Sequence, residues 1–204
     1  MTNETPWWGL VSSTAAPALL VGGWTWAAAR QEIPFDSLTQ TISALAALDA
    51  TDRWVMTSAL AGVGVAHIVT ATALRRAALP GRLVLAGGGF ATLLVAALPL
   101  PTVIGDGGSG PHAIVAGISF GALAVWPALA MRGGRRADGG KRSIPWGLRR
   151  KVALAATAAL LAAVGWFVTD LGQDMSQVGL SERVAAGAQA LWPLLVVLST
   201  RRSG

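Results

Sequence analysis

Six long runs of uncharged residues dominate the chain, and short segments between them carry nearly all of the charges. Each run has close to the ~20 residues that a helix needs to cross a ~30 Å hydrocarbon core. Only helices and closed barrels satisfy the backbone in lipid, and apolar runs of this length predict helices. The runs are Trp7–Ala29, Trp54–Leu74, Leu83–Ile104, His112–Met131, Val152–Thr169 and Val184–Thr200.

This pattern predicts an all-α, polytopic membrane protein whose six transmembrane helices form one bundle. Apolar residues make up 53% of the chain and charged residues only 13%, so little sequence remains for a soluble domain. Because the runs lie close together, residues 1–204 are interpreted as a single integral-membrane helical domain. Membrane lipids are the expected surroundings.

The segment FDSLTQTISALAALDATDRW, residues 35–54, predicts one further helix between the first two runs. Its apolar residues recur at i, i+4 and i+7, which is the spacing of one helical face. We expect a short helix over residues 37–48 that covers the outer end of the bundle and turns Asp49 and Asp52 inward. The alternative is that Asp49 lies in a loop and Asp52 only caps the next helix. The apolar residues are Leu38, Ile42 and Leu45.

Basic residues gather in alternate loops, and this distribution predicts the orientation. Lys and Arg are concentrated after the second, fourth and sixth runs, and short loops of this kind stay in the cytoplasm. Both termini are therefore expected on the cytoplasmic side of a cell inner (plasma) membrane, with the loops at 30–53, 102–112 and 170–183 outside. The net charge of +6 is then a topology and anionic-lipid signal, and no nucleic-acid partner is expected.

Acidic residues show the opposite distribution. Eight of the ten Asp and Glu residues fall on the outer side, although acidic residues contribute little to topology. Either the outer loops are simply solvated, or the acids line a functional site. The outer acids are Glu32, Asp36, Asp49, Asp52, Asp106, Asp170, Asp174 and Glu182.

The outer end of the fifth run carries our first choice for a catalytic acid, Asp170. Trp166, Asp170 and Asp174 are spaced four residues apart and share one helical face. An ionisable group at the edge of a span is a functional hypothesis by default, and the alternative is an Asp at the water boundary beside a belt Trp. Glu182 and Arg183 could instead form a structural ion pair. The other candidate catalytic acids are Asp49, Asp52 and Glu182.

Tryptophan is the dominant aromatic residue, with nine Trp, four Phe and no Tyr. Each Trp taken singly suits the membrane-interface belt, but a cluster facing inward beside carboxylates would stabilise a positive charge. We expect a pocket near the outer face between the first, second, fifth and sixth helices. Its expected substrate-binding residues are Trp24, Trp26, Trp54, His67, Trp166 and Asp174.

No cofactor or metal site is expected. His67 lies in the middle of the second run and His112 opens the fourth, so their heights do not match for a haem between them. No His and acid spacing gives a zinc site, and the DxxD at 49–52 lacks a second acidic motif for magnesium. Cysteine is absent, which excludes thiol chemistry. A buried, hydrogen-bonded His67, with or without a polar channel, is the expected state.

Two glycine motifs predict close helix packing. GGG at residues 87–89 lies inside a span and lacks the following Lys of a phosphate loop. GISFG at 117–121 is a GxxxG pattern, which lets helices approach closely in membranes.

An ordered set of motifs resembles an actinobacterial membrane family, catalogued as domain of unknown function 998, over nearly the whole chain. The motifs are TISALAALDATDRWVMT, GVGVAHIVTATAL, the Pro-His pair of the fourth run, Trp-Pro at 126–127 and GLSERVAAGAQALWP. The resemblance implies a six-helix membrane domain and no particular activity. Asp49, Asp170 and Asp174 are not part of the family pattern. The positions that match its recurrent polar residues are Asp52, Arg53, His67, His112, Glu182 and Arg183.

A second similarity, of type rather than motif, is to small integral-membrane terpene cyclases of bacterial and fungal meroterpenoid pathways. These enzymes are similar in size, lack metal motifs and use carboxylic acids within a helical bundle. Such chemistry needs a protonated carboxyl as general acid, aromatic faces beside the carbocation and a dry cavity. The outer acids, the Trp faces and the small-residue helices of this chain are compatible with it.

Two classes of function therefore stand. One is an enzyme acting on a prenylated or lipid-like substrate from the bilayer, best described as a metal-independent, acid-initiated terpene cyclase. The other is a non-enzymatic membrane protein, either a small transporter or an accessory subunit of a membrane complex. No inverted repeat or pair of broken helices is evident, which counts mildly against a transporter. The oligomeric state stays open.

Overall fold

The computed structural model describes residues 5–103, 109–132, 144–173 and 175–202. Within these ranges the named elements are six long α-helices and two short 3-10 helices. They are α1 (Trp7–Ala29), η1 (Ser43–Ala46), α2 (Trp54–Ala73), α3 (Leu79–Ala97), α4 (Gly110–Ala130), η2 (Trp146–Leu148), α5 (Arg150–Gly172) and α6 (Val178–Arg201).

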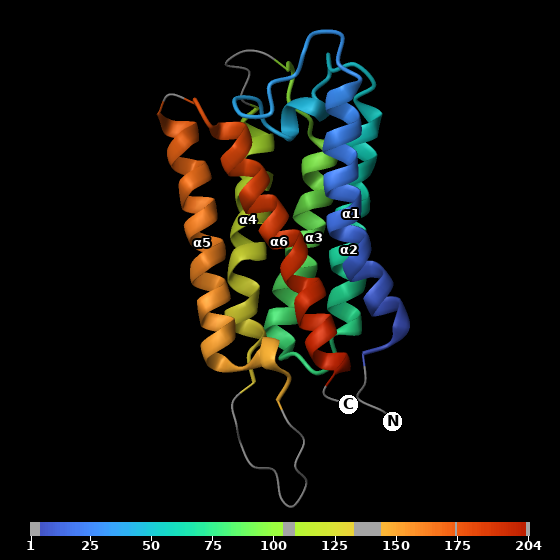
Figure 1. The fold of residues 1–204 in the computed structure, drawn as a ribbon, viewed down its shortest axis with the longest axis vertical. Helices are drawn as coiled ribbons and strands as arrows, with labels where there is room; N and C mark the ends of the chain where they lie inside the picture. The colour runs from blue at the N-terminus through green and yellow to red at the C-terminus, as the bar shows by residue number, and fades with distance from the viewer. Residues whose placement is uncertain (1–4, 104–108, 133–143, 174, 203–204) are drawn as a thin grey trace, which may run out of the picture.

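The long helices run up and down and form a closed bundle (Figure 1). Each packs against the next along the chain, and α6 lies against both α5 and α1, which closes the ring. The start of α1 and the end of α6 lie at one end of the bundle, which we call the inner end (Figure 1). The opposite end, where α1 leads to α2 and α5 leads to α6, is called the outer end.

Five of the long helices, α2 to α6, are long and apolar enough to cross a membrane by length and composition. The chain is therefore an all-helical protein with several candidate membrane spans. α1 is not among the five, although it has 23 residues and lies beside α2. Its tryptophans and its polar SST sequence at 12–14 lower its hydropathy.

Two clusters of buried apolar side chains fill the bundle. The outer cluster joins η1 to α1, α2, α3 and α6 and includes Leu20, Leu45, Met56, Val95 and Ala190. The inner cluster joins the inner halves of α2, α3, α4 and α6 and includes Leu74, Leu85, Trp126, Leu148 and Val196.

The two glycine motifs differ in how closely neighbouring helices approach them. Gly89 lies so close to α2 that an added Cβ would come within 2.6 Å of the Gly64 carbonyl oxygen, and Gly88 lies against Leu123 of α4. The GGG prediction is therefore confirmed for these two positions. The prediction for GISFG is wrong within this bundle, because no described atom of another helix lies within 4 Å of the Cβ positions of Gly117 and Gly121.

Residues 37–48 do not form the continuous helix that the apolar spacing predicts. Turns lead into the four-residue η1, and Leu38 is 54% exposed, while Ile42 and Leu45 are buried. We call residues 35–50 the cap, since η1 lies over the outer end of the bundle (Figure 1). The expected location is thus confirmed, but the helix and its three-residue apolar face are wrong.

Hydrogen bonds join the cap to the first turns of α6. The backbone N–H groups of Gly179 and Leu180 both donate to the Leu38 carbonyl, at 2.8 and 3.1 Å. Arg183 donates to the carbonyls of Ser37 and Gln40, at 3.0 and 2.9 Å. A side chain at position 179 would collide with these two carbonyls, so a glycine is required there.

Candidate functional site

A small chamber with a mainly apolar lining lies in the outer half of the bundle, beneath the cap. Side chains of α1, α2, α3, α4 and α6 form its wall, and Ile42 and Ser43 of the cap form its outer end. The chamber has a volume of about 60 Å³. Its polar lining residues are Ser43, His67, Thr92, Ser119, Glu182 and Gln189.

Glu182 lies at the outer end of this chamber and is only 4% exposed. One carboxylate oxygen accepts a hydrogen bond from the backbone N–H of Ile42, and the other lies 3.4 Å from the Ser43 hydroxyl. Arg183 does not pair directly with this carboxylate but binds cap carbonyls instead. Glu182 is therefore a buried carboxyl group whose partners are neutral.

His67 lies on the chamber wall in the middle of α2 and is 1% exposed. Its Nδ1 atom is buried and has no hydrogen-bond partner in the part of the chain that the structure describes. The expected burial is thus confirmed, while the expected hydrogen bond is not found for this atom. An unpaired polar atom in a buried site calls for a partner such as water or a ligand.

Three further polar side chains line the chamber. The hydroxyls of Thr92 and Ser119 join α3 to α4 at 2.8 Å. Gln189 is 1% exposed, and its amide donates to the Phe120 carbonyl of α4 at 2.9 Å. These polar groups can exchange hydrogen bonds with water, but the rest of the lining is apolar.

Glu182 and His67 lie at different depths. From a rise of 1.5 Å per residue, Glu182 is roughly 6 Å below the outer end of α6 and His67 roughly 20 Å below that of α2. They share one chamber but are not in direct contact.

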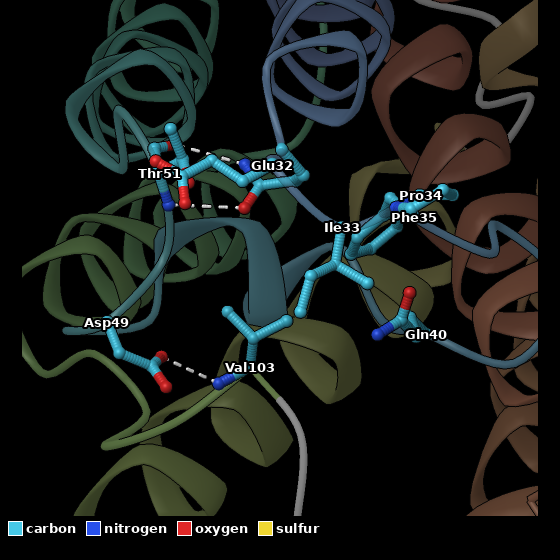
Figure 2. Close-up of a pocket in the computed structure, with 9 residues that line it drawn as sticks. Glu32, Ile33, Pro34, Phe35, Gln40, Asp49, Thr51 and Val103 are labelled. Carbon is cyan, nitrogen blue, oxygen red and sulfur yellow. Dashed lines mark hydrogen bonds between the residues drawn. The ribbon is translucent and has the colours of Figure 1, made fainter.

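A second hollow, the outer pocket, lies on the opposite side of the cap and has a volume of about 200 Å³. Figure 2 shows it between the end of α1, the cap and the segment after α3. Asp49 accepts a hydrogen bond from the Val103 N–H at 2.7 Å (Figure 2). The Gln31 amide pairs with the backbone of Thr51. The other lining residues are Glu32, Ile33, Pro34, Phe35 and Gln40.

The inward orientation expected for Asp49 and Asp52 is wrong. Asp49 is exposed at the outer pocket and joins the cap to the segment after α3. Asp52 has a left-handed backbone with φ of 50°, a conformation that Asp tolerates better than most residues. Its carboxylate pairs with Arg30 and is 44% exposed. Asp49 therefore lies in a loop, as in the alternative interpretation. The other part of that alternative is wrong, because the N-cap of α2 is Arg53 and the Asp52 side chain makes no capping hydrogen bond.

Asp170 lies at the outer end of α5 and does not line either hollow. Its backbone carbonyl accepts from Met175 at 3.2 Å, while its buried Oδ2 has no partner among the residues described. Trp166, one turn deeper, is 38% exposed. Asp174 lies outside the described residues. The expected sharing of a proton between Asp170 and Asp174 stays a prediction.

The four tryptophans are not gathered around one pocket. Trp26 and Trp54 are 62% and 64% exposed, as belt residues are. The Arg53 guanidinium lies 4.3 Å from the Trp54 ring centre. Trp24 alone packs against the outer core cluster, with Arg183 5.8 Å from its ring. The aromatic side chain that lines the chamber is Phe120, which sequence analysis did not single out.

His112 has a structural role at the outer end. Its ring Nδ1 lies 2.7 Å from the carbonyl of Leu98, just after α3, and its backbone N–H donates to Ser109. Among the described residues, no three His, Asp or Glu side chains are grouped so as to bind a metal ion.

Gln189 is the chamber residue that sequence analysis should have found. Glu182, Ala186 and Gln189 follow the i, i+4, i+7 spacing of one helical face, and an amide in the middle of an apolar span needs a buried partner. Thr92 and Ser119 gave no comparable signal, because a single hydroxyl can bond to its own helix. Their role depends on the contact between α3 and α4.

The model of a protein family described as "Protein of unknown function (DUF998)" matches residues 14–199. This range begins within α1 and ends within α6, so it includes the cap and the chamber. No curated protein and no solved structure matches the chain. The family resemblance is thereby confirmed, and the similarity to terpene cyclases gains no support from these comparisons.

Proposed function

The chain belongs to the DUF998 family, and we propose that it is an integral-membrane enzyme that uses Glu182 as a proton donor toward a prenylated or lipid-like substrate. The observation that carries the proposal is the position of Glu182, 4% exposed at the end of an interior chamber. Ionisable residues inside membrane bundles are costly and mark functional sites. Glu182 replaces Asp170 as our first choice of acid.

The reaction that we assign is an acid-initiated cyclisation or rearrangement. The Glu182 carboxyl gives its proton to an alkene or epoxide, and the substrate becomes a carbocation while Glu182 becomes a carboxylate. Phe120, on the chamber wall, offers an aromatic face to that cation. A second double bond of the substrate then attacks the cation to form the ring bond, and the new cation loses a C–H proton to the Glu182 carboxylate, which gives a neutral cyclic product and regenerates the acid. No metal is needed for these steps.

The chamber is too small to hold a prenyl chain in the described conformation. Pockets for drug-sized ligands measure roughly 300–1,000 Å³, whereas the chamber measures about 60 Å³. A prenyl chain therefore requires the chamber to widen. Widening at the outer end requires the cap to leave its hydrogen bonds to α6 and also requires Ile42 and Leu45 to leave the outer cluster, in which both are buried.

The test compares Glu182→Gln with Asp49→Asn and Asp170→Asn in detergent-solubilised protein. Gln keeps an oxygen that can accept from Ile42 but has no acidic proton, so the fold should persist. Conversion of a prenylated phenol and of its terminal epoxide is followed by mass spectrometry. We expect at least a 100-fold loss of turnover in Glu182→Gln and little change in the two controls. A folded Glu182→Gln protein with normal turnover would overturn the assignment.

A second candidate, a small proton-linked transporter, is favoured by the same chamber volume. A space of about 60 Å³ suits water or a small ion better than a lipid. If folded wild-type protein converts no prenylated substrate, the enzyme proposal is removed. Proton uptake into proteoliposomes, followed with a pH-sensitive dye, then tests the transporter.

We further propose that all six long helices cross the membrane with both termini in the cytoplasm. α1 supports this, because it has 23 residues and packs along α2 and α6. The basic residues of the loops at the inner end support the orientation.

A further inference from the structure

We propose that the chamber opens sideways into the bilayer, between α4 and the outer half of α5, and that the Phe120 and Phe167 rings close this route. A lipid-like molecule in the leaflet beside the outer half of the bundle enters here with an apolar chain end. The inference names how the substrate reaches Glu182, so it rests on the proposed function. Access to the chamber can be measured without turnover, however, and the two proposals can therefore fail separately.

The Phe120 ring lies between the chamber and α5. It lines the chamber from α4, and its centre is 5.2 Å from the centre of the Phe167 ring of α5. No described residue of α5 lines the chamber itself. The Gln189 amide donates to the Phe120 carbonyl at 2.9 Å, so the backbone of α4 stays joined to α6. The part of this wall that can turn aside is the Phe120 side chain.

The outer half of α5 is held to the bundle mainly by Phe167. Of residues 161–172, which the structure describes in full, Phe167 alone is buried, with 8% of its surface exposed. Only 17% of the most apolar stretch of α5 is buried, compared with 39–50% in the other four candidate spans. The Thr169 hydroxyl donates within its own helix, to the Gly165 carbonyl. The outer half of α5 is thus the least tightly packed part of the chamber's surroundings.

The inner half of α5 is fixed by polar contacts. The Thr157 hydroxyl accepts the backbone N–H of Ala128 in α4, at 3.0 Å. In η2, which leads into α5, the Gly147 N–H donates to the Ser199 hydroxyl of α6 at 3.3 Å. A movement of α5 away from α4 is therefore expected in its outer half, where Phe167 meets the wall of the chamber.

The surroundings of the cap and of α5 decide which route costs less. Movement of the cap breaks its hydrogen bonds to α6 and takes Ile42 and Leu45 out of the outer cluster toward water, which the hydrophobic effect opposes. Movement of α5 replaces a protein contact by lipid tails, which are as apolar as the side chains that they meet. The hydrophobic effect does not oppose that exchange, so the sideways route is favoured.

The experiment follows a thiol placed in the chamber by Ala190→Cys, in the full chain in lipid nanodiscs. Ala190 lines the chamber and is 1% exposed, and the chain has no other cysteine. Two reagents with the same reactive group are compared. Octyl methanethiosulfonate dissolves in the bilayer, whereas trimethylammonium-ethyl methanethiosulfonate stays in water. Mass spectrometry gives the rate of modification by each reagent, without any substrate.

Two further substitutions in the Ala190→Cys protein should open the chamber on different sides. We expect Phe167→Ala to raise the rate with the octyl reagent at least tenfold and to leave the rate with the charged reagent unchanged. Leu45→Ala, in the cap, should raise the rate with the charged reagent instead. Phe90→Ala removes a ring of α3 that is 57% exposed, so it is the matched control and should change neither rate.

The proposal is overturned if the octyl reagent modifies Phe167→Ala no faster than Phe90→Ala. It is also overturned if that reagent does not reach the thiol while Phe167 is in place, because the chamber would then not open to the bilayer. If Phe167→Ala does not fold, Phe167→Leu, which keeps an apolar side chain without the ring, decides instead. Rapid labelling by the octyl reagent in protein without turnover would remove the enzyme proposal and support the route.

Discussion

Glu182 and Arg183 are neighbours on α6, yet they bind opposite kinds of backbone group in the cap. Glu182 accepts the Ile42 N–H, and Arg183 donates to the carbonyls of Ser37 and Gln40. The cap forms no ladder or long helix of its own, so its buried polar groups need partners from elsewhere. These two side chains provide them, while the Glu182 carboxylate also faces the chamber.

Replacing Arg183 by Lys should loosen the cap. Lys lacks the planar guanidinium that reaches several carbonyls at once, and hydrogen bonds to charged groups contribute about 1.5–3 kcal/mol each. We expect the variant to lose about 1–3 kcal/mol of unfolding free energy, measured from tryptophan fluorescence in detergent. Arg75→Lys, at an exposed inner position, is the matched control and should change little. Equal stability of the two variants would contradict the binding role.

Asp36 should make the stability of the cap depend on pH. Hydrogen bonds from the Leu38 N–H and the Thr39 hydroxyl hold the pKa of this exposed carboxyl below its usual value of 3.8. A folded pKa below the unfolded one stabilises the protein above the unfolded value, and this contribution is lost as the pH falls through the folded value. Wild type should thus be more stable than Asp36→Asn at pH 6, and the difference should shrink below about pH 4.

The melting temperatures of both proteins between pH 6 and pH 3 test this linkage. The effect should be small, because the side chain is exposed and solvent screens its charge. Asp170→Asn serves as the control, since Asp170 lies on α5, away from the cap. A difference between wild type and Asp36→Asn that stays constant over this range would contradict the linkage.

At the scale of elements, helices and loops differed in how far the sequence could predict them. Each predicted span overlaps a long helix, with shifts such as Leu79 in place of Leu83 at the start of α3, because apolar length alone decides a span. The helix predicted over residues 37–48 was wrong, because the spacing of the apolar residues in the cap was interpreted as helical periodicity. The conformation of the cap depends instead on α6, which follows more than a hundred residues later.

The GGG motif offers a comparison between adjacent residues of one helix. Gly89→Ala should lose about 1–3 kcal/mol, because a Cβ there would collide with the backbone of α2. Gly87→Ala should be neutral or gain up to about 1 kcal/mol from helix propensity, because nothing lies within 4 Å of its Cβ position. Thermal unfolding of both variants in the same detergent measures the difference. Equal stability would show that α2 and α3 can separate at little cost.

At the scale of the whole molecule, the site was only half predictable. Glu182 and His67 could be chosen because ionisable residues are rare in spans. The packing of the helices into a ring decides which residues line the chamber. It brings Glu182 and His67 to the chamber and leaves Asp49 and Asp170 away from it. Sequence order contains no such information, since the lining residues come from five helices and the cap.

The charged side chains at the two ends of the bundle also bind different groups. At the inner end, Arg82 donates to the Ala71 carbonyl and Arg132 to that of Arg76, both at or just after the end of α2. Carbonyls at helix ends lack partners within the helix, so these basic residues stabilise the fold as well as favouring the cytoplasmic side. At the outer end, Asp49 and Asp52 join loops to each other.

This asymmetry leads to a test of orientation by cysteine labelling. The chain has no cysteine, so single substitutions give an unambiguous signal. A membrane-impermeant maleimide should label Thr102→Cys on intact cells, because this exposed residue lies at the outer end. Arg75→Cys and Asn3→Cys should be labelled only after permeabilisation, because the proposed orientation places the basic loops and the N-terminus in the cytoplasm. Asn3→Cys labelled on intact cells, with Arg75→Cys still protected, would mean that α1 does not cross the membrane. Protection of both Thr102→Cys and Arg75→Cys on intact cells, in protein that is still folded by tryptophan fluorescence, would contradict the six-span arrangement, because α3 would then not cross. The protected Arg75→Cys protein is also the control for leakage, because the reagent reaches that position only if the membrane is broken.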